Sequence, residues 1–182
     1  MKILTGRLRG QTILFRPNPN LRPTSDKARK AIFDMLQGAF ENRRALDLFS
    51  GTGALGFEAL SQGASYAAFV ENNVFQCRKI EENLSRFKMT DAARIYEEDV
   101  LEWVRTQTSE APFDFIFLDP PYAETLAFQT MELIAERGLL SKNGFLVTEC
   151  RKKVKPEPCK NLALVREKHY GQAKILVYRP VL

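Results

Sequence analysis

The sequence predicts an α/β fold in which helices cover a mostly parallel sheet. Short apolar runs alternate with longer amphipathic stretches through the centre of the chain, which is the pattern of repeated β-α units. The run at residues 113–118 is too apolar for a half-exposed strand and suits the buried middle of a parallel sheet. A glycine-rich segment at residues 51–56 lies between an expected strand and an expected helix, where α/β folds bind ligands.

The core elements follow from the period of the apolar residues. Gly63 and Gly138 end two of the helices, because glycine tolerates the left-handed conformation that follows a helix. The expected strands are residues 45–49, 67–70, 93–96, 113–118 and 144–149. The expected helices are residues 55–62, 74–88, 100–106 and 125–137, the second with Phe75, Ile80, Leu84 and Phe87 in the core.

The last two apolar runs predict an antiparallel hairpin that closes one edge of the sheet. They span residues 162–168 and 174–178, and the turn signal between them is Tyr170-Gly171. His169 is expected to be a structural or surface residue without a partner acid.

An N-terminal extension precedes the first strand. Residues 2–15 predict a small hairpin, and residues 26–36 predict a helix whose cap is a hydroxyl side chain. Prolines between the two predict an extended connector, because proline restricts the backbone. The turn is expected at Arg9-Gly10, the cap at Ser25 or Thr24, and the connector prolines are Pro17, Pro19 and Pro23.

Length and charge indicate one domain with basic ends. With 182 residues and 45% hydrophobic composition, the chain is expected to form a single domain over residues 1–182. Residues 1–44 are its basic extension and residues 45–182 its catalytic core. Residues 1–44 carry ten Lys/Arg and three Asp/Glu, residues 45–150 carry eight and seventeen, and residues 151–182 carry nine and two. Basic ends of this kind favour a polyanionic partner.

The composition argues against membrane and metal-binding classes. No apolar run approaches the roughly 18 residues that span a bilayer, and the N-terminus lacks a signal-peptide pattern. Three cysteines form no CxxC pair, and the chain has one histidine, so neither a metal site nor a disulfide framework is expected. A cytoplasmic protein, with no membrane association and no metal, is the expectation.

The glycine loop and the acid after the second strand predict an adenosine-containing cofactor. Gly51, Gly53 and Gly56 form a G-x-G-x-x-G loop, in which small residues let a ligand approach the backbone, and Ser50 at its start is counted among the cofactor-binding residues. Glu71 lies twenty residues after Gly51 and could accept both ribose hydroxyls. This pair of features fits NAD and S-adenosylmethionine equally well.

Two further acids bear on the choice of cofactor. Asp47 precedes the glycine loop, where it could accept hydrogen bonds from loop amides or meet the cationic methionyl end of S-adenosylmethionine. A pyrophosphate would be repelled there. Asp99, after the third strand, could receive the adenine amino group or could be an ordinary helix N-cap.

The most specific feature is Asp119-Pro120-Pro121-Tyr122, after the fourth strand. The lone pair of an aniline-like amine is delocalised into its ring, so an enzyme must direct the amine by holding its two N–H groups. The Asp119 carboxylate and the Pro120 carbonyl are the expected acceptors. Tyr122 supplies a face on which an extruded base could stack, and the base must leave its own stack first. The motif predicts methylation of a conjugated amino group.

A polar and basic cluster lies upstream of the core. It is suited to gripping phosphate or to bridging to the edge of the cofactor. Its members are Arg22, Pro23, Thr24, Ser25, Asp26 and Arg29, and the alternative interpretation is a capped helix start with solvated arginines.

These residues together resemble the RsmD family of bacterial 16S rRNA guanine-N2 methyltransferases over nearly the whole chain. The matching segments are LTGRLRG from Leu4, RPTSDKARKAIFDML from Arg22, LDLFSGTGALGFEALSQGA from Leu46, FDFIFLDPPY from Phe113, and the ending at Tyr170-Gly171. Lys30, where the family often has Glu, and the loop at residues 156–158 depart from the family pattern.

The resemblance implies a fold, a reaction and a partner. The fold is a Rossmann-like class I methyltransferase with a seven-stranded sheet, and the reaction is methyl transfer from S-adenosylmethionine to N2 of a guanine. The partner would be 16S rRNA, the small ribosomal subunit or an assembly intermediate. Apart from the resemblance, a monomer is expected. The implied residues are Asp47, Gly51, Gly53, Glu71 and Asp99 for the cofactor, Asp119, Pro120 and Tyr122 for the amine with Asp119 also beside the cofactor, and Arg7, Arg9 and the Arg22 segment for RNA.

Other functions remain open on the sequence. The Asp-Pro-Pro-Tyr logic also serves adenine N6 in DNA or glutamine N5 in protein, although glutamine enzymes usually have Asn at position 119 and DNA enzymes carry a further recognition domain. A nicotinamide-dependent oxidoreductase would leave Asp47 and the Asp119 motif unexplained. A non-catalytic RNA-binding assembly factor would suit the basic ends but not the intact cofactor loop.

Overall fold

The computed structural model describes residues 1–17, 24–36, 38–107, 109–110, 112–120, 124–156 and 158–181, without the side chain of Glu124. Four residues with predicted roles, Arg22, Pro23, Pro121 and Tyr122, lie outside these ranges, as does Pro19 of the predicted connector.

The structure is built on a seven-stranded sheet with the strand order β3-β2-β1-β4-β5-β7-β6. The first five strands in this order are parallel, and β7 runs antiparallel to both of its neighbours. The predicted parallel sheet with an antiparallel C-terminal hairpin is therefore confirmed. The strands are β1 Arg44–Leu48, β2 Tyr66–Glu71, β3 Ala93–Glu97, β4 Phe113–Leu118, β5 Leu140–Arg151, β6 Leu162–Tyr170 and β7 Ala173–Pro180.

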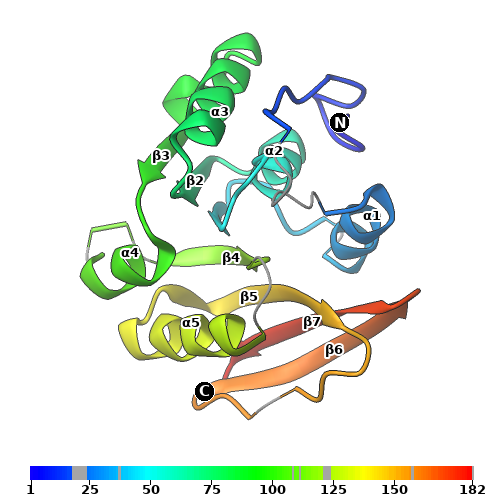
Figure 1. Cartoon of the computed structure of the whole chain (residues 1–182), viewed down its shortest axis with the longest axis vertical. Helices are drawn as coiled ribbons and strands as arrows, with labels where there is room; N and C mark the ends of the chain where they lie inside the picture. Colours follow the sequence, from blue (N-terminus) through cyan, green and yellow to red (C-terminus); the bar gives the residue numbers. More distant parts are fainter. Residues whose placement is uncertain are drawn as a thin grey trace.

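Helices cover both faces of this sheet (Figure 1). One core packs α1, α2 and α3 against one face, and a second core packs α4 and α5 against the other. Along β2 and β7, and from Phe115 onward in β4, successive residues enter opposite cores, because successive side chains of a strand point to opposite faces. Phe115 and Phe117 thus belong to the first core, and Ile116 and Leu118 to the second. The helices are α1 Asp26–Met35, α2 Ala54–Ser61, α3 Val74–Arg86, α4 Val100–Thr106 and α5 Glu124–Arg137, with a 3₁₀ turn, η1, at Thr90–Ala92.

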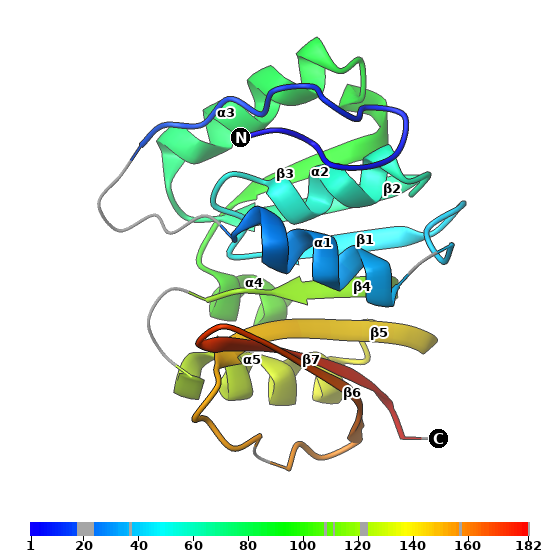
Figure 2. The ribbon, with the colours of Figure 1, turned by 90° about the vertical axis from the view of Figure 1, so that its right-hand side faces the viewer.

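The N-terminal segment doubles back as a short, irregular hairpin, as the sequence predicts. Lys2 and Thr12 form an antiparallel bridge, the Ile3 amide donates to the Gln11 carbonyl at 2.9 Å, and the Ile13 amide donates to the Met1 carbonyl at 2.8 Å. A helix side chain also bonds its backbone, since Asn83 accepts from the Leu14 amide at 2.9 Å and donates to the Leu14 carbonyl at 2.7 Å. The segment consequently lies over α3, on the side of the sheet that carries α1 and α2 (Figure 2).

Three sequence predictions are corrected by packing. The strand expected from residue 144 begins at Leu140, which pairs with Phe113 before an irregularity in the register. Phe75, expected in the core, has 46% of its surface exposed, and the Arg16 guanidinium lies 4.1 Å from its ring centre. His169 does have a partner acid, since its Nε2 lies 2.6 Å from Glu167 Oε1.

Two features of the described residues bear on the membrane and metal predictions. None of the described helices is long and apolar enough to span a bilayer. In the same residues, no group of three or more His, Cys, Asp or Glu is arranged to hold a metal ion. The three cysteines are free thiols.

Candidate active site

The glycine loop turns sharply between β1 and α2. Positive φ angles of 57° at Phe49, 52° at Gly51 and 73° at Gly53 bring the chain from the strand to the first turn of the helix. Gly53 itself is the N-cap in the left-handed region. A Cβ on Gly56 would lie 2.3 Å from the Phe69 ring, so only glycine allows α2 to approach β2 this closely. The loop places its backbone amides at the carboxyl end of the central strand.

Ser50 and Glu71 hold this loop in place. Ser50 Oγ donates to the Asp47 carbonyl at 2.6 Å, and the residue is buried. Glu71, at the end of β2, accepts from the Gly51 amide through Oε2 and from the Asn73 amide through Oε1, each at 2.8 Å. Each carboxylate oxygen has a second lone-pair direction, so Glu71 can brace the loop and still accept a hydroxyl from a ligand.

Asp47 is a buried acid in the middle of this arrangement. It is 2% exposed, and its Oδ2 accepts from the Gly56 amide at 2.9 Å. Burial raises the pKa of Asp47 well above its usual value, the Gly56 hydrogen bond opposes this shift, and the charges of Asp119 and Glu71 add to it. Acids from β1, β2 and the end of β4 therefore face one another at one edge of the sheet. A ligand with a positive charge fits this surrounding, and a pyrophosphate does not.

Asp99 caps α4. Its Oδ1 accepts from the amides of Leu101 at 2.9 Å and Glu102 at 3.2 Å. Its Oδ2 accepts no bond from the part of the chain that the structure describes. Asp99 is therefore a helix N-cap, one of the two roles that the sequence allowed. Its Oδ2 remains available to a ligand.

Asp119 and Pro120 follow β4 at the same edge as the glycine loop. The Thr24 hydroxyl donates to Asp119 Oδ2 at 2.7 Å, which joins the start of α1 to the end of β4. Ser25 is the N-cap of α1 and accepts from the Ala28 amide at 3.1 Å. Thr24, predicted to contact RNA, thus lies against the Asp119 carboxylate, a contact that spacing along the chain could not indicate.

The prediction that Arg29 grips phosphate is wrong. Its side chain is fully buried, because α1 packs it between three oxygen groups. Its Nη2 lies 2.7 Å from Asp26 Oδ1 and donates to the Lys2 carbonyl at 2.9 Å, and its Nη1 lies 3.4 Å from Glu58 Oε1. Glu58 also accepts from the Leu4 amide at 2.7 Å. Arg29 therefore holds the extension to the core, whereas Arg7 and Arg9 are exposed to solvent.

The structure adds two residues that the sequence analysis did not select. Glu149 lies near the end of β5, beside the end of β4, and Tyr170 is the last residue of β6. The only sequence signal for Glu149 is a charged residue that ends an apolar strand.

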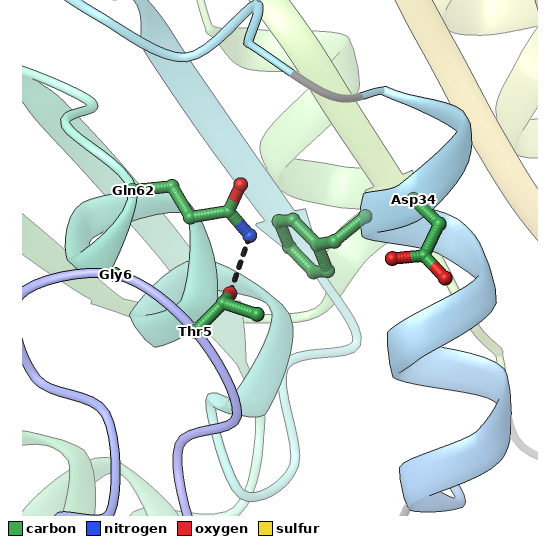
Figure 3. Close-up of a pocket in the computed structure, with 5 residues that line it drawn as sticks. Thr5, Gly6, Asp34 and Gln62 are labelled. Atoms are coloured by element: carbon green, nitrogen blue, oxygen red, sulfur yellow. Dashed lines mark hydrogen bonds between the residues drawn. The ribbon is translucent and has the colours of Figure 1, made fainter.

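A cavity of about 320 Å³ lies away from this edge. Its lining comes from the N-terminal segment, α1 and the C-terminal end of α2, where Gln62 Nε2 donates to Thr5 Oγ1 at 2.7 Å (Figure 3). Since α2 begins at the glycine loop and ends at this cavity, the cavity is at the opposite end of the helix from the candidate site. The lining residues are Thr5, Gly6, Phe33, Asp34 and Gln62.

The chain is similar to proteins named as methyltransferases over nearly its full length. A putative rRNA methyltransferase, YlbH, from Bacillus subtilis is 33% identical over 98% of both chains. The ribosomal RNA small subunit methyltransferase D of Buchnera aphidicola is 32% identical over 97% of this chain and 91% of its own. The structure of a putative methyltransferase, yhhF, from Escherichia coli superposes with a TM-score of 0.88 at 27% identity, covering 100% of this chain and 99% of that one. A family model described as conserved hypothetical protein 95 matches residues 1–179, so the chain belongs to this family, the RsmD family that its motifs resemble.

Proposed function

We propose that this protein transfers a methyl group from S-adenosylmethionine to the N2 amino group of a guanine in small-subunit ribosomal RNA. The observation that carries the proposal is the meeting of Asp47, Glu71 and Asp119 at the carboxyl ends of neighbouring parallel strands. This edge, between β1 and β4, is where the strand order reverses, and open α/β sheets bind ligands at such points. The names of the relatives support an rRNA substrate.

The proposed cofactor site uses the loop, the buried acid and the two outer acids. Glu71 would accept the ribose hydroxyls, the free oxygen of Asp99 would accept the adenine amino group, and Asp47 would face the cationic end. Gly51 and Gly53, which have no side chains, would let the cofactor approach the backbone of the loop closely. Ser50 stabilises the conformation of the loop through its hydrogen bond to the Asp47 carbonyl. When bound there, S-adenosylmethionine supplies a methyl group on a positively charged sulfur.

The proposed acceptor site directs the amine. The Asp119 carboxylate and the Pro120 carbonyl would each accept one N–H of the amino group, which leaves the nitrogen lone pair aimed at the methyl carbon. Thr24 occupies one direction on Asp119 Oδ2, and this bond restricts the carboxylate to one orientation. Asp119 would accept the proton that the amine loses on methylation and pass it to water.

The target base would have to be unstacked from its RNA helix before it binds in this site. We infer that the RNA extrudes the base, since neither Asp119 nor Pro120 could reach an amino group inside a helix. Tyr122 is the proposed stacking partner. The exposed Arg7 and Arg9, Arg22 and the hydroxyl of Ser25 would contact the phosphate backbone. We propose that the protein acts as a monomer. Its chain would form a single domain and work in the cytoplasm.

Two measurements test this function directly. Purified protein is incubated with labelled S-adenosylmethionine and with small-subunit rRNA or particles that lack modification, and the methylated nucleotide is then mapped. We expect label on N2 of one guanine. Thermal unfolding is followed with S-adenosylhomocysteine and, separately, with NADH. A shift with NADH alone would favour an oxidoreductase, and label on adenine or on protein would replace the proposed substrate.

Asp47→Asn should weaken S-adenosylmethionine binding by at least about thirtyfold, because the cofactor loses a buried charge partner. In the wild-type protein a bound cation favours the ionised acid, so affinity should rise with pH as the raised pKa of Asp47 is passed. The Asn variant should show no such rise. Isothermal titration across a pH series measures both effects.

The same variant should gain stability relative to wild type as the pH increases. The unfolded chain ionises near the ordinary Asp value, whereas the folded chain retains the Asp47 proton to higher pH, so the wild-type protein loses stability between these two values. The amide of the Asp47→Asn variant has no charge to bury.

Asp34→Asn, which removes an acid on α1 that pairs with Lys30, is the matched control and should leave cofactor binding unchanged. Equal pH dependence of binding in wild type and the Asp47→Asn variant would refute this role.

A further inference from the structure

Glu149 lies next to Asp119 across the two central strands of the candidate acceptor site. The parallel register pairs Leu118 with Thr148, so Asp119 and Glu149 are the next residues on strands spaced about 4.8 Å apart. Phe117 and Val147, two residues earlier on each strand, both pack in the core beneath α1, α2 and α3. Because side chains alternate along a strand, Asp119 and Glu149 are placed on this same side of the sheet.

Tyr170 lies close enough to both acids to interact with them. It is half-buried at the end of β6 and packs against the same core. Burial raises the pKa of Tyr170, and interaction with the Glu149 carboxylate and the charge of Asp119 raise it further. The Tyr170 hydroxyl is buried and makes no hydrogen bond within the described residues. The phenol is neutral and interacts with Glu149, so a small rotation would let its O–H donate to the carboxylate and restrict the orientation of that group.

The Glu149 carboxylate could distinguish one base from another, which the Asp119 carboxylate cannot do. Asp119 and Pro120 are assigned to the amino group, and neither tells guanine from other bases with an amino group. The amino group of guanine lies between two ring nitrogens, of which N1 carries a hydrogen and is a donor. The corresponding ring nitrogens of adenine and cytosine are acceptors. A carboxylate accepts from a donor and repels an acceptor, and buried mismatches of this type give strong discrimination.

We propose that Glu149, positioned by Tyr170, accepts the N1–H of the target base and so makes the site selective for guanine. This inference rests on the proposed function. It assigns Glu149 a part in base specificity that is separate from the amine-directing part of Asp119.

The test uses target nucleotides that differ at N1. Once the methylated nucleotide has been mapped, RNA is prepared with guanine or 2-aminopurine at that position. Both carry the 2-amino group, but N1 of 2-aminopurine is an acceptor. The wild-type protein should prefer guanine by about a hundredfold in kcat/KM, which is the order of the penalty for leaving one buried polar group without its hydrogen-bond partner. Glu149→Gln can donate to N1 of the analogue, so its preference should fall by tenfold or more, with unchanged affinity for S-adenosylhomocysteine.

Two further variants separate this role from a structural one. Tyr170→Phe keeps the ring and should lose part of the preference, because Glu149 is then less restrained. Glu132→Gln removes an exposed acid on α5 and should retain the wild-type preference. A loss of fold would lower the rates on both RNAs together and would leave their ratio unchanged.

The result that overturns the inference is distinct from failure of the proposed function. If wild-type protein methylates guanine and 2-aminopurine equally, or if Glu149→Gln keeps the wild-type preference, Glu149 does not read N1. If the wild-type protein places no methyl group on guanine N2 in any small-subunit rRNA or particle, the proposed function itself is wrong.

Discussion

Asp119→Ala should lower kcat for methyl transfer by about 10² to 10³, which is the effect of removing one preorganised polar group from an active site. The carboxylate is proposed to hold an N–H of the target amine, and the Thr24 hydroxyl at 2.7 Å maintains its orientation. Without it the amine can bind with its lone pair in unproductive directions. Single-turnover transfer of a labelled methyl group to rRNA measures the change.

RNA binding distinguishes this result from loss of the surface. Asp119 is proposed to act on the amine after the RNA is bound, so the Asp119→Ala variant should keep an RNA affinity close to that of wild type. Asp119→Asn preserves one oxygen acceptor and should fall between wild type and the Ala variant in kcat. A protein whose function is RNA binding alone would keep that function in both variants. Full methyl transfer by Asp119→Ala would exclude the proposed role of the carboxylate.

Arg29→Met should destabilise the protein by about 3 to 5 kcal/mol, the usual cost of removing one partner of a buried ion pair. Glu58 is only 1% exposed, and the substitution removes its cationic partner. Burial already raises the pKa of Glu58, and the Arg29 charge is one of the effects that lower it again. The variant also frees the Lys2 carbonyl that Arg29 binds. Denaturant unfolding in the absence of ligand measures the loss.

A double variant tests whether the cost arises from the unpaired charge. Glu58→Gln in the Arg29→Met background removes the uncompensated acid, so the double variant should be more stable than Arg29→Met alone. Arg7→Met, at an exposed arginine of the N-terminal segment, should change stability by less than about 0.5 kcal/mol. If Arg29→Met and Arg7→Met had equal small effects, the buried pair would not be holding the extension.

Most of the sheet could be predicted because its signals are local. Apolar runs, glycines and caps lie within a few residues of the element that they specify, and β1 to β4 occur within one or two residues of their expected places. The N-terminal hairpin could be predicted as well, because its two arms are close in the sequence. The place where it packs could not be predicted, because its partners lie far along the chain: Asn83 bonds the backbone of Leu14 across 69 residues.

The candidate site divides along the same line. Asp47, the glycine loop, Glu71 and Asp119 could be selected from the sequence, since each lies at or just after the carboxyl end of a strand and parallel strands end at one edge of a sheet. The sequence alone thus determined the fold class and the chemistry-bearing loops. Tertiary structure alone decided that Arg29 is buried, that Thr24 binds Asp119 and that Glu149 lies beside it. The reason is that the environment of a polar side chain depends on groups brought to it by packing, which adjacent residues do not encode.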